Sequence, residues 1–138
     1  MFIATMQRTI SVSGRAENDN AIVEMALKLS SIHRQTNQDE KAEQGYLFCI
    51  QTQRDKMTKD EEEETRTEAD DQDTLALYGM SRDGYGQFLM SKGRVKAALV
   101  QFEEALKTSL QLNGELSETT LNIQNSIATC LSMVGKSQ

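Results

Sequence analysis

The chain has 138 residues, and none of them is a proline or a tryptophan. At the usual frequency of about 5%, a chain of this length would contain roughly seven prolines. Proline interrupts helices and begins turns, so its absence argues against a β-sandwich with many tight turns. The sequence therefore predicts long helices, in a single domain.

Residues that bind metals or act as nucleophiles are also scarce. The two cysteines, Cys49 and Cys130, lie 81 positions apart, and His33 is the only histidine, so a four-ligand zinc site cannot be assembled. We expect packing roles for the cysteines and an interface position for His33. No nucleophile and base pair or phosphate loop accompanies them, so the sequence predicts no enzyme, no cofactor, no metal and no small-molecule substrate.

Long apolar runs are missing as well, since no run approaches the roughly 20 residues that cross a bilayer. The sequence therefore predicts no transmembrane helix, and a soluble or peripheral chain.

The negative charge is concentrated in one segment. Residues 53–73 carry ten acidic and four basic residues, which equals the net charge of −6 of the whole chain. An acidic chain without a basic stripe lacks the electrostatic footprint of a nucleic-acid binder, so we expect no nucleic acid partner. We interpret the segment as a solvated helical extension or loop, with a docking surface for a basic partner as the alternative.

The first 16 residues differ in composition from the rest. They contain two arginines and no acidic residue before Glu17. We interpret 1–16 as a flexible tail, with a mitochondrial targeting segment as the alternative.

The remainder of the chain is an internal repeat. Residues 37–51 align without gaps on 93–107 at a lag of 56, and a third unit matches the second at a lag of 42. The spacing of the shared small and aromatic positions on the second helix, i, i+4, i+7, places them on one helix face. The predicted repeat core is Ala42, Tyr46, Cys49, Gly86, Ala98, Phe102, Ala105 and Ala128.

The small, aromatic, small pattern of this second helix resembles that of the tetratricopeptide repeat family. The resemblance implies an all-α array of helical hairpins, an α-solenoid of about two and a half repeats, over residues 17–138. The repeats lie near 21–52, 75–112 and 117–138, with the acidic insert at 53–73. Helices are expected near 18–34, 38–57, 70–91, 95–112 and 117–134. At the position where the family carries a tryptophan, the three repeats have Ala26, Arg82 and Gln124.

Within the family, residues 21–52 and 77–106 are most similar to a mitochondrial branch. That resemblance implies a non-enzymatic scaffold associated with respiratory complex III at the inner membrane. It also implies a role in clearing fragments of the Rieske iron-sulfur subunit. The kinesin light chains, which have 42-residue repeats, are the alternative, and they imply a cytosolic peptide-binding adaptor.

In such arrays, one face of each first helix lines a concave groove. Amide side chains there can bond both the N–H and the C=O groups of an extended peptide, although an ordinary solvated face is an open alternative. The candidate groove residues are Leu27, Ser31, Arg34, Asp83, Gln87, Asn122, Asn125 and Thr129.

The third hairpin ends after its first helix, which suggests a truncated array. We expect an apolar stripe at Ile123, Ile127, Leu131 and Val134 without a partner in the sequence, and therefore self-association through this helix.

Overall fold

The computed structural model describes residues 19–58 and 68–136, which form five α-helices and no strand. The helices are α2 (Asn20–Gln35), α3 (Asp39–Thr58), α4 (Glu68–Ser91), α5 (Val95–Asn113) and α6 (Glu118–Lys136). The prediction of an all-α hairpin array is thereby confirmed. The proposed N-terminal segment 1–16 and the middle of the acidic insert, 59–67, lie outside the described residues.

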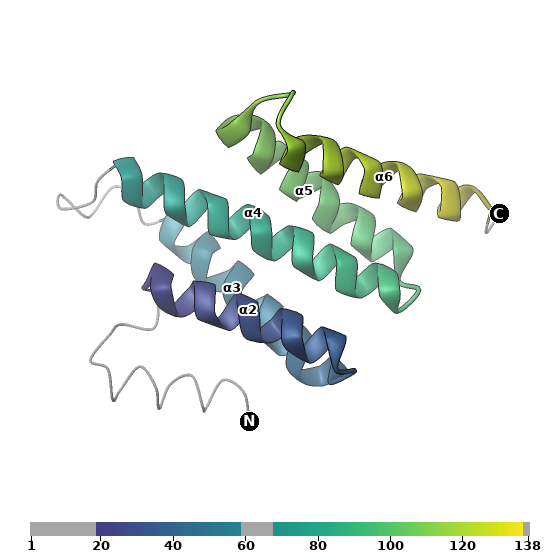
Figure 1. Ribbon diagram of the computed structural model, residues 1–138, viewed down its shortest axis with the longest axis horizontal. Helices are drawn as coiled ribbons and strands as arrows, with labels where there is room; N and C mark the ends of the chain where they lie inside the picture. The colour runs from purple at the N-terminus through teal and green to yellow at the C-terminus, as the bar shows by residue number, and fades with distance from the viewer. Residues whose placement is uncertain (1–18, 59–67, 137–138) are drawn as a thin grey trace.

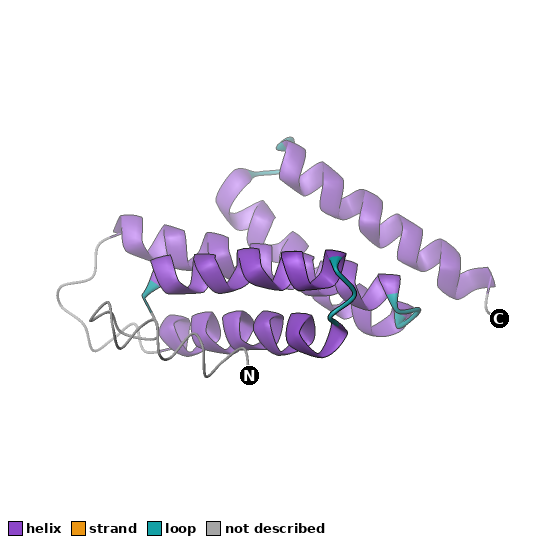
Figure 2. Ribbon diagram, turned by 60° about the horizontal axis from the view of Figure 1, so that its bottom comes forward, coloured by secondary structure: helices purple, strands orange, loops and turns teal. Residues whose placement is uncertain are grey.

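Consecutive helices pack against one another as antiparallel pairs, and α4 lies at the centre. It contacts α2, α3 and α5, while α6 packs on α5. Figure 1 shows α2, α4 and α6 in front, with α3 and α5 behind them. Figure 2 shows the short turns that join the pairs. Within the described ranges, no helix is long and apolar enough to cross a membrane.

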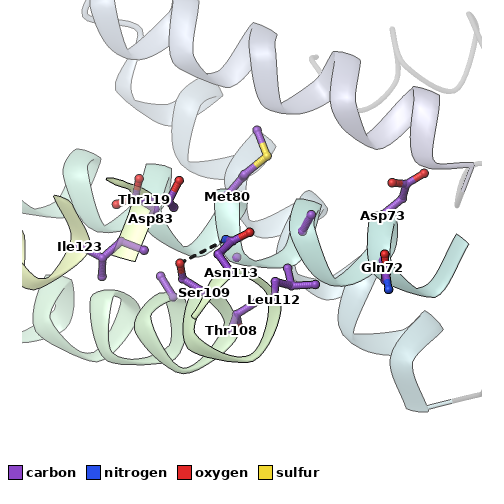
Figure 3. Close-up of a pocket in the computed structure, with 13 residues that line it drawn as sticks. Gln72, Asp73, Met80, Asp83, Thr108, Ser109, Leu112, Asn113, Thr119 and Ile123 are labelled. Atoms are coloured by element: carbon purple, nitrogen blue, oxygen red, sulfur yellow. Dashed lines mark hydrogen bonds between the residues drawn. The ribbon is translucent and has the colours of Figure 1, made fainter. Parts of the chain in front are cut away.

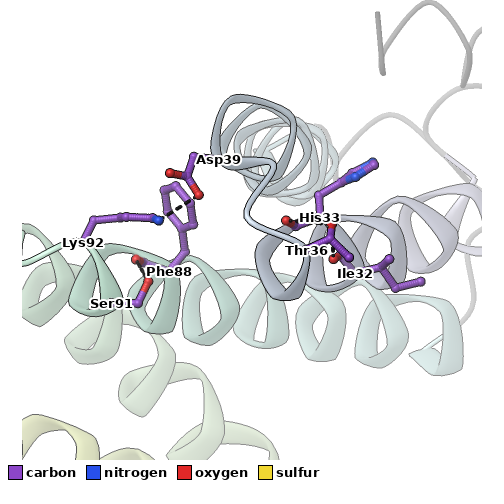
Figure 4. A network of polar contacts seen from close by, with 7 residues as sticks. All are labelled: Ile32, His33, Thr36, Asp39, Phe88, Ser91 and Lys92. Carbon is purple, nitrogen blue, oxygen red and sulfur yellow. Dashed lines mark hydrogen bonds and ion pairs between the residues drawn. The ribbon is translucent and has the colours of Figure 1, made fainter.

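The first two hairpins turn at equivalent positions of the repeat. Asn37 after α2 has a φ of 62°, and Gly93 after α4 has a φ of 76°. Glycine enters this left-handed region without cost and asparagine tolerates it. Thr36 caps the end of α2, because its backbone N–H and its Oγ1 both donate to the carbonyl oxygen of Ile32 (Figure 4).

Glycines allow α4 to approach both of its neighbours closely. A Cβ placed on Gly86 would lie 2.8 Å from Cε1 of Phe102 on α5, and one on Gly84 would lie 2.7 Å from Cε1 of Tyr46 on α3. Both aromatic side chains are fully buried. The aromatic rings therefore fill the space that the missing Cβ atoms leave.

Polar contacts fix the ends of the helices relative to one another. Lys92 at the end of α4 forms a 2.8 Å ion pair with Asp39 at the start of α3 (Figure 4). At the opposite end, the Gln53 Nε2 group donates to Oδ1 of Asn20 at 3.1 Å and to the carbonyl oxygen of Thr74 at 3.3 Å. Because Gln53 is fully buried, these bonds hold α2, α3 and α4 in one arrangement.

The structure buries seven of the eight predicted repeat-core residues, but Ala128 is exposed and its assignment to the core was wrong. Ala128 is equivalent to Gly86, which is buried because α5 packs over it. Among the described residues, no helix covers α6 in the same way. Instead, α6 buries Thr120, Ile123 and Cys130 on the side that faces α5.

The expected apolar stripe of α6 is therefore divided between two environments. Ile123 is 3% exposed and Ile127 packs partly against the core, so the expectation that these two lack a partner was wrong. Leu131 is 54% exposed, as is much of Leu121 on the same helix.

Candidate functional site

The front of the array contains a hollow between α2 and α4. Its volume is about 600 Å³, and its lining includes five of the eight candidate groove residues. Those five are Leu27, Ser31, Arg34, Asp83 and Gln87. Two exposed apolar side chains, Ile32 and Met80, also line it. Met80 shares a helix face with the predicted residues, but Ile32 was missed because an exposed isoleucine beside Ser31 has no distinguishing sequence pattern.

A second hollow, of about 370 Å³, continues the groove between α4, α5 and α6 (Figure 3). Met80 and Asp83 line both hollows, so these two side chains lie where the hollows meet. From α6, Thr119 and Ile123 contribute to the lining. We call the two hollows together the front groove.

The remaining candidate residues, Asn122, Asn125 and Thr129, are exposed on α6 but line neither hollow. The Thr129 hydroxyl donates to the backbone carbonyl oxygen of Asn125 at 3.0 Å. A different residue of α6 contacts α4: the Gln87 Nε2 group donates to Ser126 Oγ at 3.2 Å. The structure therefore brings the candidates on α2 and α4 together and leaves those on α6 apart.

Asp83 is the ionisable group at the centre of the front groove. Burial raises the pKa of its carboxyl above the ordinary value, while a hydrogen bond from Gln87 and the positive charge of Arg34 oppose that shift. Desolvation prevails over these two interactions. The groove thus holds a partly desolvated carboxylate near the cation of Arg34 and near neutral hydrogen-bonding groups, such as the Ser31 hydroxyl, which lies 3.3 Å from the Tyr46 hydroxyl.

The thiols sit in the core rather than in the groove. Cys49 is fully buried, and burial raises the pKa of its thiol to about 12. Burial also raises the pKa of the Cys130 thiol, whose Sγ lies 3.6 Å from Sδ of Met90. A thiol that stays protonated is a poor nucleophile and a poor metal ligand. In the described ranges, no group of three or more histidine, cysteine or acidic side chains is placed to hold a metal ion.

The fold and the groove define a class of protein, namely an all-α array of helical hairpins with a groove along one face. Within this class, the chain is similar over almost its full length to proteins named for tetratricopeptide repeats, which confirms the resemblance seen in the sequence. It is 33% identical to the mitochondrial tetratricopeptide repeat protein 19 of Danio rerio over 138 residues, 99% of the chain and 34% of that protein. The Homo sapiens protein of the same name is also 33% identical, over 99% of the chain and 36% of its own length.

A more distant relative is the mitochondrial homologue from Drosophila melanogaster, which is 27% identical over 93% of the chain and 32% of its own length. The chain spans about a third of the length of the curated relatives it matches. No family profile matches the chain. No solved structure matches it.

Proposed function

We propose that the chain is a non-enzymatic scaffold that binds an extended segment of a partner protein in the front groove. The observation that supports this proposal is that apolar and polar side chains together line the hollow between α2 and α4. Apolar Leu27 and Met80 lie there with the amide of Gln87 and the charged groups of Arg34 and Asp83. Apolar surface supplies affinity, while a few placed polar groups orient the bound chain.

We further propose a mitochondrial location, because the curated relatives are named mitochondrial. By the same kinship, the partner is respiratory complex III at the inner membrane, and the bound segment comes from the Rieske iron-sulfur subunit. The scaffold would thereby support complex III integrity by helping to clear Rieske fragments. Residues 1–16 act as the targeting segment in this proposal.

The groove is tested with fluorescein-labelled peptides that tile the Rieske subunit, titrated with the purified chain and followed by anisotropy. We expect one or a few peptides to bind. The Gln87→Ala and Arg34→Gln variants should weaken that binding about tenfold or more, which corresponds to about 1.4 kcal/mol. Lys107→Gln is the matched control, since Lys107 is exposed on α5 and lines no part of the groove.

Equal binding by the groove variants and the control would contradict the groove assignment. Absence of binding by every Rieske peptide would contradict the partner. The location is tested separately by imaging the chain with a C-terminal fluorescent tag in human cells. A cytosolic signal would contradict the mitochondrial proposal and favour the adaptor reading.

We also propose that the chain self-associates through the exposed side of α6, where Leu121 is 47% and Leu131 is 54% exposed. Light scattering over a concentration series should show a dimer for the parent chain and a monomer for Leu131→Lys. A parent chain that stays monomeric at high concentration would contradict this contact.

A further inference from the structure

A separate hollow, which is not part of the front groove, lies on the opposite side of α4, between α3 and α5. Its volume is about 620 Å³. Arg82 and Tyr85 of α4 form its floor, Leu47 and Arg54 lie on the α3 side, and Gln101 is on the α5 side. Figure 1 shows α3 and α5 behind α4, away from the face where α2 and α6 lie. We call this region the rear cleft, and it shares no lining residue with the front groove.

The floor of the rear cleft holds a buried cation for which the described residues provide no carboxylate partner. Arg82 is 8% exposed. Its Nε and Nη2 groups donate to the Tyr78 hydroxyl at 3.1 and 2.9 Å, and Nη1 donates to Gln101 Oε1 at 2.7 Å. These acceptors are neutral, and they use three of the five N–H donors of the guanidinium.

This arrangement is unusual because a buried charge is costly unless it is paired. The guanidinium also lies 5.1 Å from the centre of the Tyr78 ring, which gives it a favourable but weaker contact.

The charged side chains that line the rear cleft, Arg54 and Arg82, are both cations, and its other lining residues are neutral. Arg54 on α3 is exposed and, among the described residues, forms no ion pair, and no acidic residue lines the cleft. The acidic residues next to the lining residues in sequence already accept hydrogen bonds from other side chains. Glu43 accepts from Tyr85 at 2.9 Å and from Arg94 at 3.0 Å, and Asp55 accepts from Gln51 at 2.9 Å. In a chain of net charge −6, this local positive surface stands out.

We propose that the rear cleft is a second binding site, which takes an acidic segment of a partner protein. The carboxylate of a glutamate or aspartate would be held between Arg82 and Arg54, whose planar guanidinium groups match a carboxylate geometrically. Leu47, which is 46% exposed, supplies apolar surface for a neighbouring side chain of the same segment. The site is independent of the function proposed for the front groove.

The test uses two fluorescein-labelled peptides that differ only in charge. One carries two adjacent glutamates between leucines, and the other has glutamines in their place. In anisotropy titrations with the full chain, we expect the glutamate peptide to bind at least tenfold more tightly. The difference should shrink as salt rises, because exposed charges are screened.

Variants then locate the site. Arg54→Gln should weaken binding of the glutamate peptide about threefold to tenfold, and Arg82→Gln should weaken it more, since Arg82 is the desolvated partner. Lys107→Gln removes the same charge from an exposed part of α5 and should have no effect. If Arg82→Gln does not fold, as judged by circular dichroism, Arg82→Lys keeps the charge but loses the planar fork and should bind more weakly than the parent.

A second readout uses backbone amide resonances. Bound glutamate peptide should shift Leu47 and Gln101 while leaving Ser31 and Gln87 of the front groove unchanged. Equal affinity of the two peptides, or equal effects of Arg54→Gln and Lys107→Gln, would overturn the proposal. So would shifts confined to the front groove. Binding seen only after the four glutamates 61–64 are replaced by glutamine would mean that the chain's own acidic segment fills the cleft, and would overturn the partner.

Discussion

Substitution of Gly86 by alanine tests how closely α4 and α5 pack. The added methyl group would lie 2.8, 2.9 and 3.0 Å from three ring atoms of Phe102, where carbon atoms prefer about 3.5 to 4.0 Å. Phe102 is fully buried, so its ring has little room to retreat. Overpacking of this kind costs about 1 to 3 kcal/mol. Against that cost, alanine gains up to about 1 kcal/mol over glycine in a helix.

Gly135 provides the matched control, because it is also helical and a Cβ there would meet nothing within 4 Å. Gly135 lies one residue from the end of α6, so alanine gains less helix propensity there than at Gly86 in the interior of α4. The difference between the variants is therefore the overpacking cost reduced by at most about 1 kcal/mol. We expect Gly86→Ala to be less stable than Gly135→Ala, by up to about 3 kcal/mol, in urea unfolding followed by circular dichroism. Adding Phe102→Leu should relieve part of the cost in a double-mutant cycle. A Gly86→Ala variant as stable as Gly135→Ala would refute the close approach.

Three further predictions concern the groove, a turn and the core. Because burial raises the pKa of Asp83, its ionised form destabilises the folded chain at neutral pH, and this cost disappears as the pH falls through the raised pKa. At pH 7, the melting temperature of Asp83→Asn should therefore equal or exceed that of the parent chain. As the pH falls, the melting temperature of the variant should rise less than that of the parent chain. Asn37→Ala should lower the free energy of unfolding by about 1 kcal/mol, and Asn37→Gly should not, since only alanine is strained at a φ of 62°. The thiols of Cys49 and Cys130 should react with a thiol reagent at pH 8 only as fast as the chain unfolds, because burial keeps them protonated.

The helices were predictable because the repeat places equivalent small and aromatic positions at helical spacing in successive units. Together with the resemblance to helical hairpins, the repeat placed all five helices near their observed bounds. Both described ends of the acidic segment 53–73 are helical, which agrees with helices expected to 57 and from 70. α3 continues to Thr58, and α4 begins at Glu68.

Burial on α6 was less predictable because burial depends on what packs against a residue. The repeat equates Ala128 with Gly86, yet only Gly86 has a helix over it. The groove shows the same limit. A shared helix face grouped Asp83 with Gln87, but the sequence could not give which residues of α6 face α4: Ser126 contacts Gln87, whereas Asn125 lies outside the hollows.

The rear cleft shows how a departure from a repeat pattern carries information. Arg82 was visible in the sequence as a charge at a position that the repeat usually fills with an aromatic residue, but its burial against Tyr78 appeared only in the structure. Its neighbour in the chain, Asp83, lines the front groove instead. The groove contains charges of both signs, such as Asp83 and Arg34, so it selects weakly by charge. The rear cleft contains arginines and no acid, so it selects strongly. Because the two regions share no lining residue, segments with different charge can bind on opposite sides of α4 without competing for a side chain.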